Sequence, residues 1–446
     1  MHTMKPLSNI TRIATILSLL LPCAKPARAN ALGIHTMVQD NGETISQLDL
    51  AAELCGRGGW VKQLMYVQDG TEWSFDGKWT TFVDGARLRS LNVVARLHYL
   101  PPSYRANPSN FAGKPKPGAD GHYTAYKDLI RGFVSRFRGT LHYIELWNEP
   151  NLAGEWDDQP NAEEFVRALC AGYDGVKEAD PTCLVAFPGL APTNGTPDGK
   201  NIDNLVFLRS CYQSNYVCPR DGRKFKDHFD LLASHPYGMN HPPQYNSDKY
   251  GTRGYQYELN VMKEFGDDAK KVLITECGYA LGNHDDTRYP AITEELRADY
   301  MLIAFRDVWA RDIRVLGAMP YFLRAQERQP WDTPFFWVYD GGIRTAQFLA
   351  VKALRGVLED LPGNVIMRYG NYPRYPYFQD IVDARDSARA MLVANGLTPV
   401  PGPLVQHYHV TAGDVFPAGN PDDRLTPGDA DAILSLAVGL NPNNQP

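Results

Sequence analysis

The sequence lacks features that would place it in several common classes of protein. The apolar stretch near its N-terminus, "IATILSLLL", has nine residues and is far too short to span a membrane. No Cys-x-x-Cys pair occurs, so a zinc site on paired cysteines is not predicted. The first strand-like run leads into "IHTMVQDNGET", which supplies neither a glycine-rich phosphate loop nor the H-x-H pair of a metal-dependent barrel hydrolase, since His35 stands alone.

The N-terminus has the pattern of a secretory signal peptide. "MHTMKPLSNITR" carries Lys5 and Arg12 and no acidic residue, the short apolar stretch follows, and "ARA" ends at Ala29. This pattern predicts removal of residues 1–29 and a secreted or periplasmic protein with no membrane attachment. A membrane anchor is the weaker alternative because the apolar stretch is so short.

The charge balance bears on the kind of partner. The whole chain has a formal net charge of −6, with 45 Lys and Arg against 51 Asp and Glu. The expected signal carries four of the cations and no acid, so its removal leaves 41 against 51, a net charge of −10. Such a surface disfavours nucleic acid and anionic membranes as partners, whereas a neutral substrate would be indifferent to it.

Six cysteines follow the expected signal, and an even number in an exported chain permits disulfides. Cys211 and Cys218 bracket "YQSNYV" and are the predicted pair. Cys55 and Cys170 fit burial as small hydrophobic residues as well as they fit pairing. The other two are Cys183 and Cys277.

From residue 31 onward, short β-branched or aromatic runs alternate with longer stretches of helical spacing. Strand candidates lie at 32–38, 60–67, 92–100, 141–147, 183–190, 229–237, 271–279 and 315–323. Eight strand-then-helix units predict an α/β fold, a (β/α)8 TIM barrel over residues 30–358. A doubly wound open sheet is the alternative, and it lacks its usual phosphate loop here.

Two helices are especially clear. Residues 161–180 carry one apolar stripe from Phe165 to Val176, and Asn161 with Glu164 forms a capping box at the start. Residues 292–310 repeat such a stripe, and "GRGG" at 56–59 marks the end of another helix.

Polar side chains gather where the strand candidates end, which in a barrel is the end that carries the active site. A single one could be a satisfied core group, but four strands end this way. The residues are Arg96 and His98, Asn148 and Glu149, His235 and Tyr237, and Glu276.

Glu149 and Glu276 are the only glutamates at the very ends of predicted barrel strands. Two facing carboxyl groups are the machinery of glycoside hydrolysis, in which one donates a proton and the other attacks the anomeric carbon. Each negative charge is expected to raise the pKa of the other group. Asn148 offers a neutral donor for a sugar hydroxyl. Glu145, two pleats back from Glu149 on the same face of the strand, is expected to be an interior barrel residue that supports the site.

"WNEPN" and "LITECGY" resemble the strand-four and strand-seven motifs of clan A retaining glycoside hydrolases, barrels such as families 5, 39 and 51. "E-x-W-N-E-P-N", "SHPYG" and "RLHY" are most similar to family 39. The resemblance covers residues 31–358 and implies that Glu149 is the acid/base and Glu276 the nucleophile, with no cofactor for catalysis. Arg96, His98, Asn148, His235 and Tyr237 would then contact the substrate.

The chain departs from these families in two places. "AMPYFL" offers Tyr321 and Phe322 where strand eight usually ends in tryptophan, and no room remains for the β-sandwich that often follows such barrels. The expected function is hydrolysis of β-glycosidic bonds in poly- or oligosaccharides. A transglycosylase with the same chemistry and a non-catalytic carbohydrate-binding barrel are the alternatives.

Loop aromatics follow strands two and eight. They are Trp73, Phe75, Trp79, Trp331, Phe335, Phe336 and Trp337. Most are expected to anchor their loops to the barrel, and Trp331 is the predicted sugar-stacking residue.

The C-terminal part has a different texture. Residues 359–400 form an extension of uncertain fold, and "TPVPGP" begins a linker and tail over 401–446. The tail resembles one half of a dockerin, an EF-hand-like calcium loop leading into a short helix. Asp414, Asp422 and Asp429 would be the calcium ligands, and a cohesin-like protein would be the partner. An acidic turn that caps a helix without metal is the equal alternative.

Overall fold

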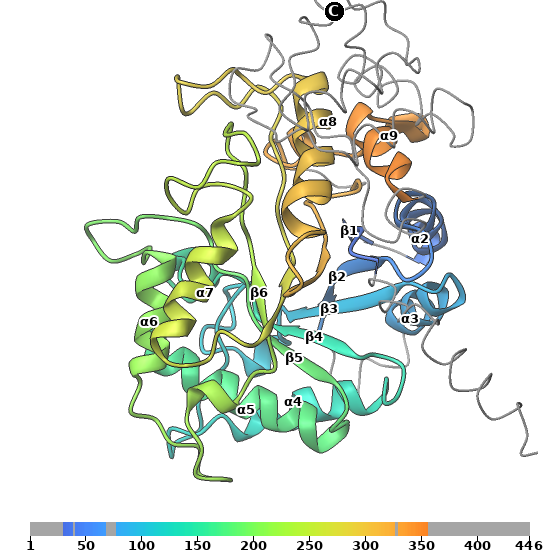
Figure 1. The fold of residues 1–446 in the computed structure, drawn as a ribbon. Coiled ribbons are helices and arrows are strands. Elements are labelled where there is room, and N and C mark those ends of the chain that lie inside the picture. The colour runs from blue at the N-terminus through green and yellow to red at the C-terminus, as the bar shows by residue number, and fades with distance from the viewer. Residues whose placement is uncertain (1–29, 39–40, 68–76, 326–328, 356–446) are drawn as a thin grey trace, which may run out of the picture.

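The computed structural model describes residues 30–38, 41–67, 77–325 and 329–355 of the chain (Figure 1). The predicted signal peptide, the extension over 359–400 and the dockerin-like tail lie outside these residues. So do the predicted calcium ligands Asp414, Asp422 and Asp429, which therefore remain predictions.

Eight parallel strands form one sheet in the order β1 to β8, and each strand pairs with its neighbour in sequence. The strands are β1 (Gly33–Thr36), β2 (Trp60–Tyr66), β3 (Asn92–His98), β4 (Tyr143–Leu146), β5 (Leu184–Phe187), β6 (Leu231–Ser234), β7 (Lys271–Ile274) and β8 (Val315–Ala318). Every one falls inside a strand candidate read from the sequence.

The sheet closes on itself. Leu32 makes a parallel bridge with Ala318, and the backbone N–H of His35 donates to the carbonyl oxygen of Pro320 at 3.0 Å. These bonds join β8 to β1, so the (β/α)8 barrel prediction is confirmed and the open doubly wound sheet is wrong.

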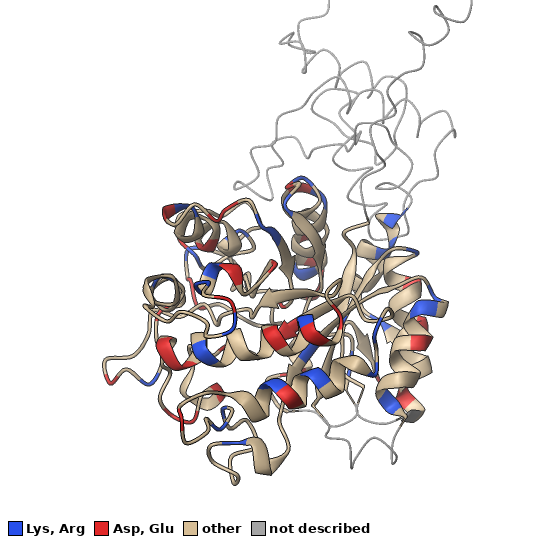
Figure 2. Cartoon of the chain, turned by 90° about the horizontal axis from the view of Figure 1, so that it is seen from below, with Lys and Arg blue, Asp and Glu red and all other residues tan. Residues whose placement is uncertain are grey.

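The helices lie on the outside of the barrel, around the strands (Figure 1). They are α2 (Asn41–Cys55), α3 (Lys78–Leu88), α4 (Thr124–Ser135), α5 (Ala162–Ala179), α6 (Asn204–Gln213), α7 (Gly254–Glu264), α8 (Glu294–Ile303) and α9 (Ala346–Ala353). Along these helices acidic and basic residues are interspersed (Figure 2). Among the described residues, no helix is both long and apolar enough to cross a membrane.

Local sequence signals set the helix boundaries. The Asn161 side chain accepts a hydrogen bond from the backbone N–H of Glu164, so the predicted cap of α5 is confirmed. Helix α2 ends at Cys55, directly before Gly56. Helix α8 is shorter than its apolar stripe, because a π-helical segment, Ala304–Trp309, completes it.

Shorter elements occupy the connections. They are the 3₁₀ turns η1 (Pro102–Tyr104), η2 (Ala153–Glu155), η3 (Phe225–Asp227), η5 (Thr333–Phe335) and η6 (Asp340–Gly342), and the two-residue strands β9 (Val338–Tyr339) and β10 (Ile343–Arg344). The strand pair β9–β10 is antiparallel and lies beyond β8.

The N-terminal half of the barrel interior is packed with apolar side chains. Trp60, the first residue of β2, lies in this cluster, and a Cβ atom on Gly317 would come within 2.6 Å of its ring. Glycine at this position of β8 therefore makes room for the indole. The other buried members are Val94, Ala186, Leu231, Ala233, Leu273 and Met319. The polar interior residues lie toward the opposite, C-terminal end of the strands.

The predicted Cys211–Cys218 disulfide is wrong. All six cysteines of the described residues are free and buried. Cys211 lies in the last turn of α6 and faces the hydrophobic core. The Cys218 sulfur instead points to Asp174 on α5, with Sγ 3.5 Å from Oδ2. The two cysteines are only seven residues apart in sequence, but the Cys211 side chain packs in the hydrophobic core, whereas the Cys218 side chain contacts Asp174.

Candidate active site

The C-terminal ends of four strands bring the predicted polar residues together. Arg96 on β3 donates from Nη1 to Oδ1 of Asn148 at 2.6 Å and to Oε1 of Glu276 at 2.8 Å. His235, after β6, lies 2.8 Å from Glu149 through Nδ1. These contacts connect the ends of β3, β4, β6 and β7 in one buried network, as expected for a barrel active site.

Glu276 is surrounded by groups that favour its ionised form. Lys62 on β2 lies 3.0 Å from its Oε1, and the Tyr237 hydroxyl donates to Oε2 at 2.8 Å. Burial alone would raise the pKa of Glu276, but Lys62, His235 and Arg96 together hold it well below its usual range. The expected mutual elevation by the second carboxylate is therefore outweighed at this position.

Glu149 lies on a tight turn after β4. Trp147 and Glu149 both have positive φ angles, 80° and 37°, which non-glycine residues seldom adopt. The backbone N–H of Glu149 donates to the carbonyl oxygen of Gly189 at 3.0 Å. The carboxyl group reaches His235, and the Glu149 side chain is 16% exposed.

The two glutamates face each other. One carboxylate oxygen of Glu149 and one of Glu276 lie within 4.8 Å of each other, and a ring nitrogen of His235 lies within the same distance of both. Oxygen and nitrogen donors this close could surround a metal ion, but Lys62 and Arg96 bind Oε1 of Glu276 and Tyr237 donates to Oε2, so both oxygens of this carboxylate are already occupied. The arrangement suits carboxylate chemistry better than cation binding.

His235 is a buried cation among the glutamates. Burial favours the neutral ring, but the charge on Glu276, the Glu145 carboxylate 3.7 Å from Nε2 and the hydrogen bond to Glu149 raise the pKa of His235 to about 9. The ring fits against Gly189, where a Cβ atom would come within 2.1 Å of its Cδ2. Glycine is required there by space.

Glu145 lies inside the barrel beneath this network, as the sequence predicted. It is fully buried and accepts hydrogen bonds from the Gly189 N–H at 3.0 Å and the Thr275 hydroxyl at 2.9 Å. Burial opposes ionisation, yet Lys62 and His235 lower the pKa of Glu145 to about 2. It therefore supports the site as a fixed buried charge.

His98 and Glu155 lie behind Asn148. The Asn148 amide donates to Glu155 Oε1 at 3.1 Å, and His98 Nε2 lies 3.4 Å from Glu155 Oε2. Burial and the neighbouring Glu149 raise the pKa of Glu155 to about 7. The His98 side chain is fully buried, and its neighbours are Glu155 and the ring of Tyr99, on which it stacks.

Sequence reasoning missed Lys62 and Glu155. Lysine within a strand reads as solvent-facing, and only the alternation in "WVKQLMY", which places Lys62 and Leu64 on the same face, could have indicated an inward side chain. Glu155 lies on η2, outside any strand, where nothing in the sequence separates it from a surface loop residue.

Aromatic side chains rim the site on two sides. Tyr66, Tyr99 and Phe111 form one aromatic group beyond β2 and β3, with ring centroids 4.4 to 5.8 Å apart, and Phe111 is 55% exposed. On the other side, Phe335 packs 5.7 Å from the ring of Tyr237. Trp331 is 66% exposed and lies next to Asp332.

The loop aromatics are placed mostly as expected. Trp79, Phe336 and Trp337 are buried anchors, whereas Trp73 and Phe75 lie outside the described residues. Tyr321, which follows β8, is held by a hydrogen bond from its hydroxyl to Asp332 at 2.7 Å. Its ring centroid lies 5.4 Å from that of His35, at the end of β8, where this chain departs from the usual tryptophan of the families that it resembles.

The fold resembles the barrels of glycoside hydrolases of known structure. A family 39 glycoside hydrolase from the gut symbiont Bacteroides cellulosilyticus matches at a TM-score of 0.54 and 14% identity, over 75% of this chain and 65% of that protein. A glucosidase from Croceicoccus marinus matches at a TM-score of 0.49 and 14% sequence identity, and the match covers 74% of this chain and 68% of that protein. A family 30 subfamily 8 xylanase from Clostridium acetobutylicum matches at a TM-score of 0.47 and 14% sequence identity, and the match covers 74% of this chain and 72% of that protein.

At these identities the likeness is one of fold, and this chain spans less than two thirds of the length of the family 39 protein. No protein-family model matches the chain, and no curated protein sequence is similar to it.

Proposed function

We propose that the protein is a glycoside hydrolase that cleaves β-glycosidic bonds of poly- or oligosaccharides with retention of configuration. The observation that carries the proposal is the approach of Glu149 and Glu276 to within 4.8 Å across the C-terminal end of the barrel. Retaining enzymes hold their two carboxyl groups about 5–5.5 Å apart, whereas inverting enzymes need about 6.5–9.5 Å to admit water. The short separation supports retention.

In the first step, Glu149 donates its proton to the glycosidic oxygen while Glu276 attacks the anomeric carbon. The bond to the leaving group breaks, and a covalent glycosyl-enzyme forms through Glu276. In the second step Glu149, now a base, takes a proton from water, which attacks the same carbon and releases Glu276. The reaction uses two side chains and water and needs no cofactor.

The surroundings of each glutamate support these roles. Lys62, Arg96 and Tyr237 bind the Glu276 carboxylate and keep it ionised and oriented for attack. His235 Nδ1 lies 2.8 Å from Glu149 and 3.9 Å from Glu276, so the imidazole ring bridges the two carboxyl groups. Burial and its neighbours raise the pKa of the Tyr237 hydroxyl well above its usual value, so it stays a hydrogen-bond donor.

Asn148 is the proposed donor to the sugar 2-hydroxyl. Its Oδ1 accepts from Arg96, and its amide nitrogen donates one hydrogen to Glu155, which leaves the second hydrogen for substrate. Arg96 and Glu155 thus fix the orientation of the amide. This is a positioning role for both residues.

The aromatic rim supports a saccharide of more than one unit. Pyranose rings present C–H faces that pack on aromatic rings, and the aromatic group Tyr66, Tyr99 and Phe111 offers such a surface beside the site. Trp331, on the opposite loop, is the second proposed stacking position. Export through the predicted signal peptide would bring the enzyme to extracellular or periplasmic carbohydrate.

A panel of aryl β-glycosides that differ in the sugar tests activity and substrate together. The wild-type protein is expected to release the phenol from at least one member, and Glu276→Gln, which keeps shape but not charge, is expected to lose this activity. Carbohydrate binding without turnover on any member would instead make the protein a non-catalytic binding barrel. Transfer to added sugar in preference to water would make it a transglycosylase.

A further inference from the structure

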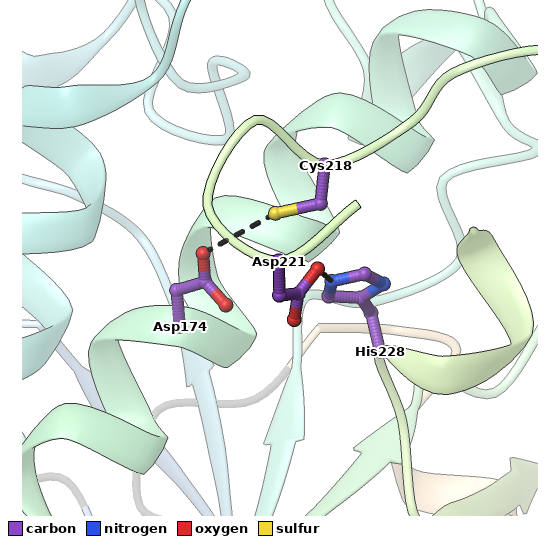
Figure 3. Close-up of side chains that lie close together, drawn as sticks. All are labelled: Asp174, Cys218, Asp221 and His228. Carbon is purple, nitrogen blue, oxygen red and sulfur yellow. Dashed lines mark hydrogen bonds and ion pairs between the residues drawn. The ribbon is translucent and has the colours of Figure 1, made fainter. Parts of the chain in front are cut away.

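A second cluster of chemically reactive side chains lies far from the proposed active site. Asp174 on α5, Cys218 and Asp221 in the turn after α6, and His228 after η3 converge so that one ligand atom of each lies within 4.8 Å of the others (Figure 3). The loop between α6 and β6 leads into the N-terminal end of β6. It therefore lies at the end of the barrel opposite the active site.

His228 presents an unpaired nitrogen to this cluster. Its ring is fully buried, and Nδ1 lies 2.9 Å from the carbonyl oxygen of Lys224. A carbonyl can only accept, so Nδ1 donates to it and Nε2 is the ring nitrogen that faces the cluster. Nε2 has no hydrogen-bond partner and faces Oδ1 of Asp221 at 3.5 Å. Asp221 Oδ1 also accepts from the backbone N–H of Arg223 at 3.0 Å, so an oxygen and a nitrogen ligand atom converge on one point.

The other two ligand atoms are also in contact, because the Cys218 thiol donates to Asp174. Cys218 Sγ lies 3.5 Å from Oδ2 of Asp174 (Figure 3). With Zn–S and Zn–O bonds of about 2.3 and 2.0 Å at tetrahedral angles, sulfur and oxygen ligands lie about 3.5 Å apart. The observed separation matches that spacing.

Outer groups orient the ligands as they do in metal sites. Arg220 binds Oδ1 of Asp174 at 2.6 Å and Oδ2 of Asp221 at 3.0 Å, and Arg223 also binds Oδ2 of Asp221. In each carboxylate the other oxygen is thereby turned to the cluster. The His228 bond to a backbone carbonyl is likewise the usual outer contact of a metal-binding histidine.

The turn itself resembles a metal-binding knuckle. Cys218-Pro-Arg-Asp221-Gly222 places Asp221 at the position that a second cysteine occupies in Cys-x-x-Cys, which is why the absence of that pair hid the site.

We propose that Asp174, Cys218, Asp221 and His228 form a tetrahedral site for a structural zinc ion. One sulfur, one imidazole nitrogen and two carboxylate oxygens suit zinc, whereas calcium and magnesium prefer oxygen ligands alone. The four residues come from α5, the turn after α6 and the segment before β6. Zinc would fasten this end of the barrel and would take no part in the reaction at Glu149 and Glu276.

The test is a titration of the reduced, metal-free full-length protein with Co²⁺ as a spectroscopic substitute for zinc. We expect one equivalent to bind with a sulfur-to-cobalt charge-transfer band, which zinc then displaces. Cys218→Ser should abolish the band, and His228→Gln should weaken zinc binding by at least about 10-fold. Two controls should leave the charge-transfer band and the zinc affinity unchanged. They are Cys183→Ser, at a buried cysteine outside the cluster, and His142→Gln, at an exposed histidine.

A second measurement remains informative if a variant is less stable. Zinc is expected to raise the Tm of the wild-type protein and of both controls, but not that of Cys218→Ser or Asp221→Asn. The comparison uses the zinc-dependent increment, so a lower basal Tm does not affect it. No stoichiometric cobalt binding, or a charge-transfer band and a Tm increment that survive in Cys218→Ser, would overturn the proposal.

Discussion

Lys62 Nζ lies 3.0 Å from Oε1 of Glu276, and both side chains are buried inside the barrel. The same ammonium group lies 3.3 Å from Oε2 of Glu145. Lys62 therefore holds two carboxylates together beneath the site. Removal of the lysine would leave both carboxylates buried without their cation. For a buried pair, such a loss lowers the free energy of unfolding by about 3–5 kcal/mol.

Lys62→Met is expected to shift the acidic limb of the pH profile of kcat/KM to higher pH. Lys62 lowers the pKa of Glu276, and the nucleophile must be ionised, so loss of the positive charge raises the pH at which activity appears. Lys127→Met, which removes a lysine paired with Glu178 on the outer helices, is the control and should leave the limb in place. An unmoved acidic limb in a folded Lys62→Met protein would separate Lys62 from the nucleophile.

The basic limb of the same profile is expected to depend on Glu149. That limb reports loss of the proton from the general acid, so Glu149→Gln should abolish it. Glu155 is the competing assignment, because burial and Glu149 raise its pKa to about 7, within the same range. Glu155→Gln should lower activity but keep a basic limb. If the limb instead survives in Glu149→Gln and disappears in Glu155→Gln, Glu155 is the acid.

The fold followed from the sequence because each barrel strand is buried on both faces. Runs such as "NVVARLHYL" and "KVLITECGY" are nearly continuous in apolar or β-branched residues, and the helical stretches between them have a different period. The ends of these runs also located Glu149 and Glu276, since polar residues there have few structural reasons to occur.

The remaining features depend on side-chain direction, which spacing alone does not determine. Lys62 points inward because β2 alternates, and Cys211 points into the core because of its position on α6. The cluster of Asp174, Cys218, Asp221 and His228 brings together residues from three separate segments of the chain. No local pattern brings Asp174 close to Cys218, so the disulfide was predicted and the cluster was missed.

Phe111→Ala tests the aromatic group beside the site. Phe111 is 55% exposed and packs on Tyr99 at 4.4 Å, so it offers a surface at little cost to the barrel. We expect KM for an oligosaccharide to rise about 2- to 10-fold, the effect of one lost aromatic contact, with kcat unchanged. A short aryl glycoside should show no change. Trp331→Ala, measured alongside, tests the stacking position on the opposite loop, and unchanged KM values in both variants would remove the rim from substrate binding.

His235 predicts a pH dependence of stability. Its folded pKa of about 9 exceeds the unfolded value near 6.5, so its contribution is complete below about pH 6.5 and is lost as pH rises through 9. The wild-type free energy of unfolding should fall by up to about 3 kcal/mol more than that of His235→Gln over this interval. Urea unfolding at pH 6 and pH 9.5 measures the difference, with the exposed His142→Gln as the control. Parallel curves for wild type and His235→Gln would show that the histidine is neutral in the folded protein.

The roles of Glu149 and Glu276 are separated most directly by azide rescue, with an activated aryl β-glycoside whose phenol leaves without protonation. In Glu149→Ala, Glu276 still forms the glycosyl-enzyme, and azide, which needs no base, should attack it and give the β-glycosyl azide after two inversions. In Glu276→Ala no covalent intermediate forms. Azide should then attack the anomeric carbon directly and give the α-glycosyl azide after one inversion.

The measurement is the anomeric configuration of the azide product from each variant, determined by NMR. The account predicts the β product from Glu149→Ala and the α product from Glu276→Ala, so one reagent gives opposite stereochemistry. The reverse pair of products would exchange the two assignments. Folded variants that azide fails to rescue on a substrate turned over by the wild type would contradict double displacement at this pair of carboxylates.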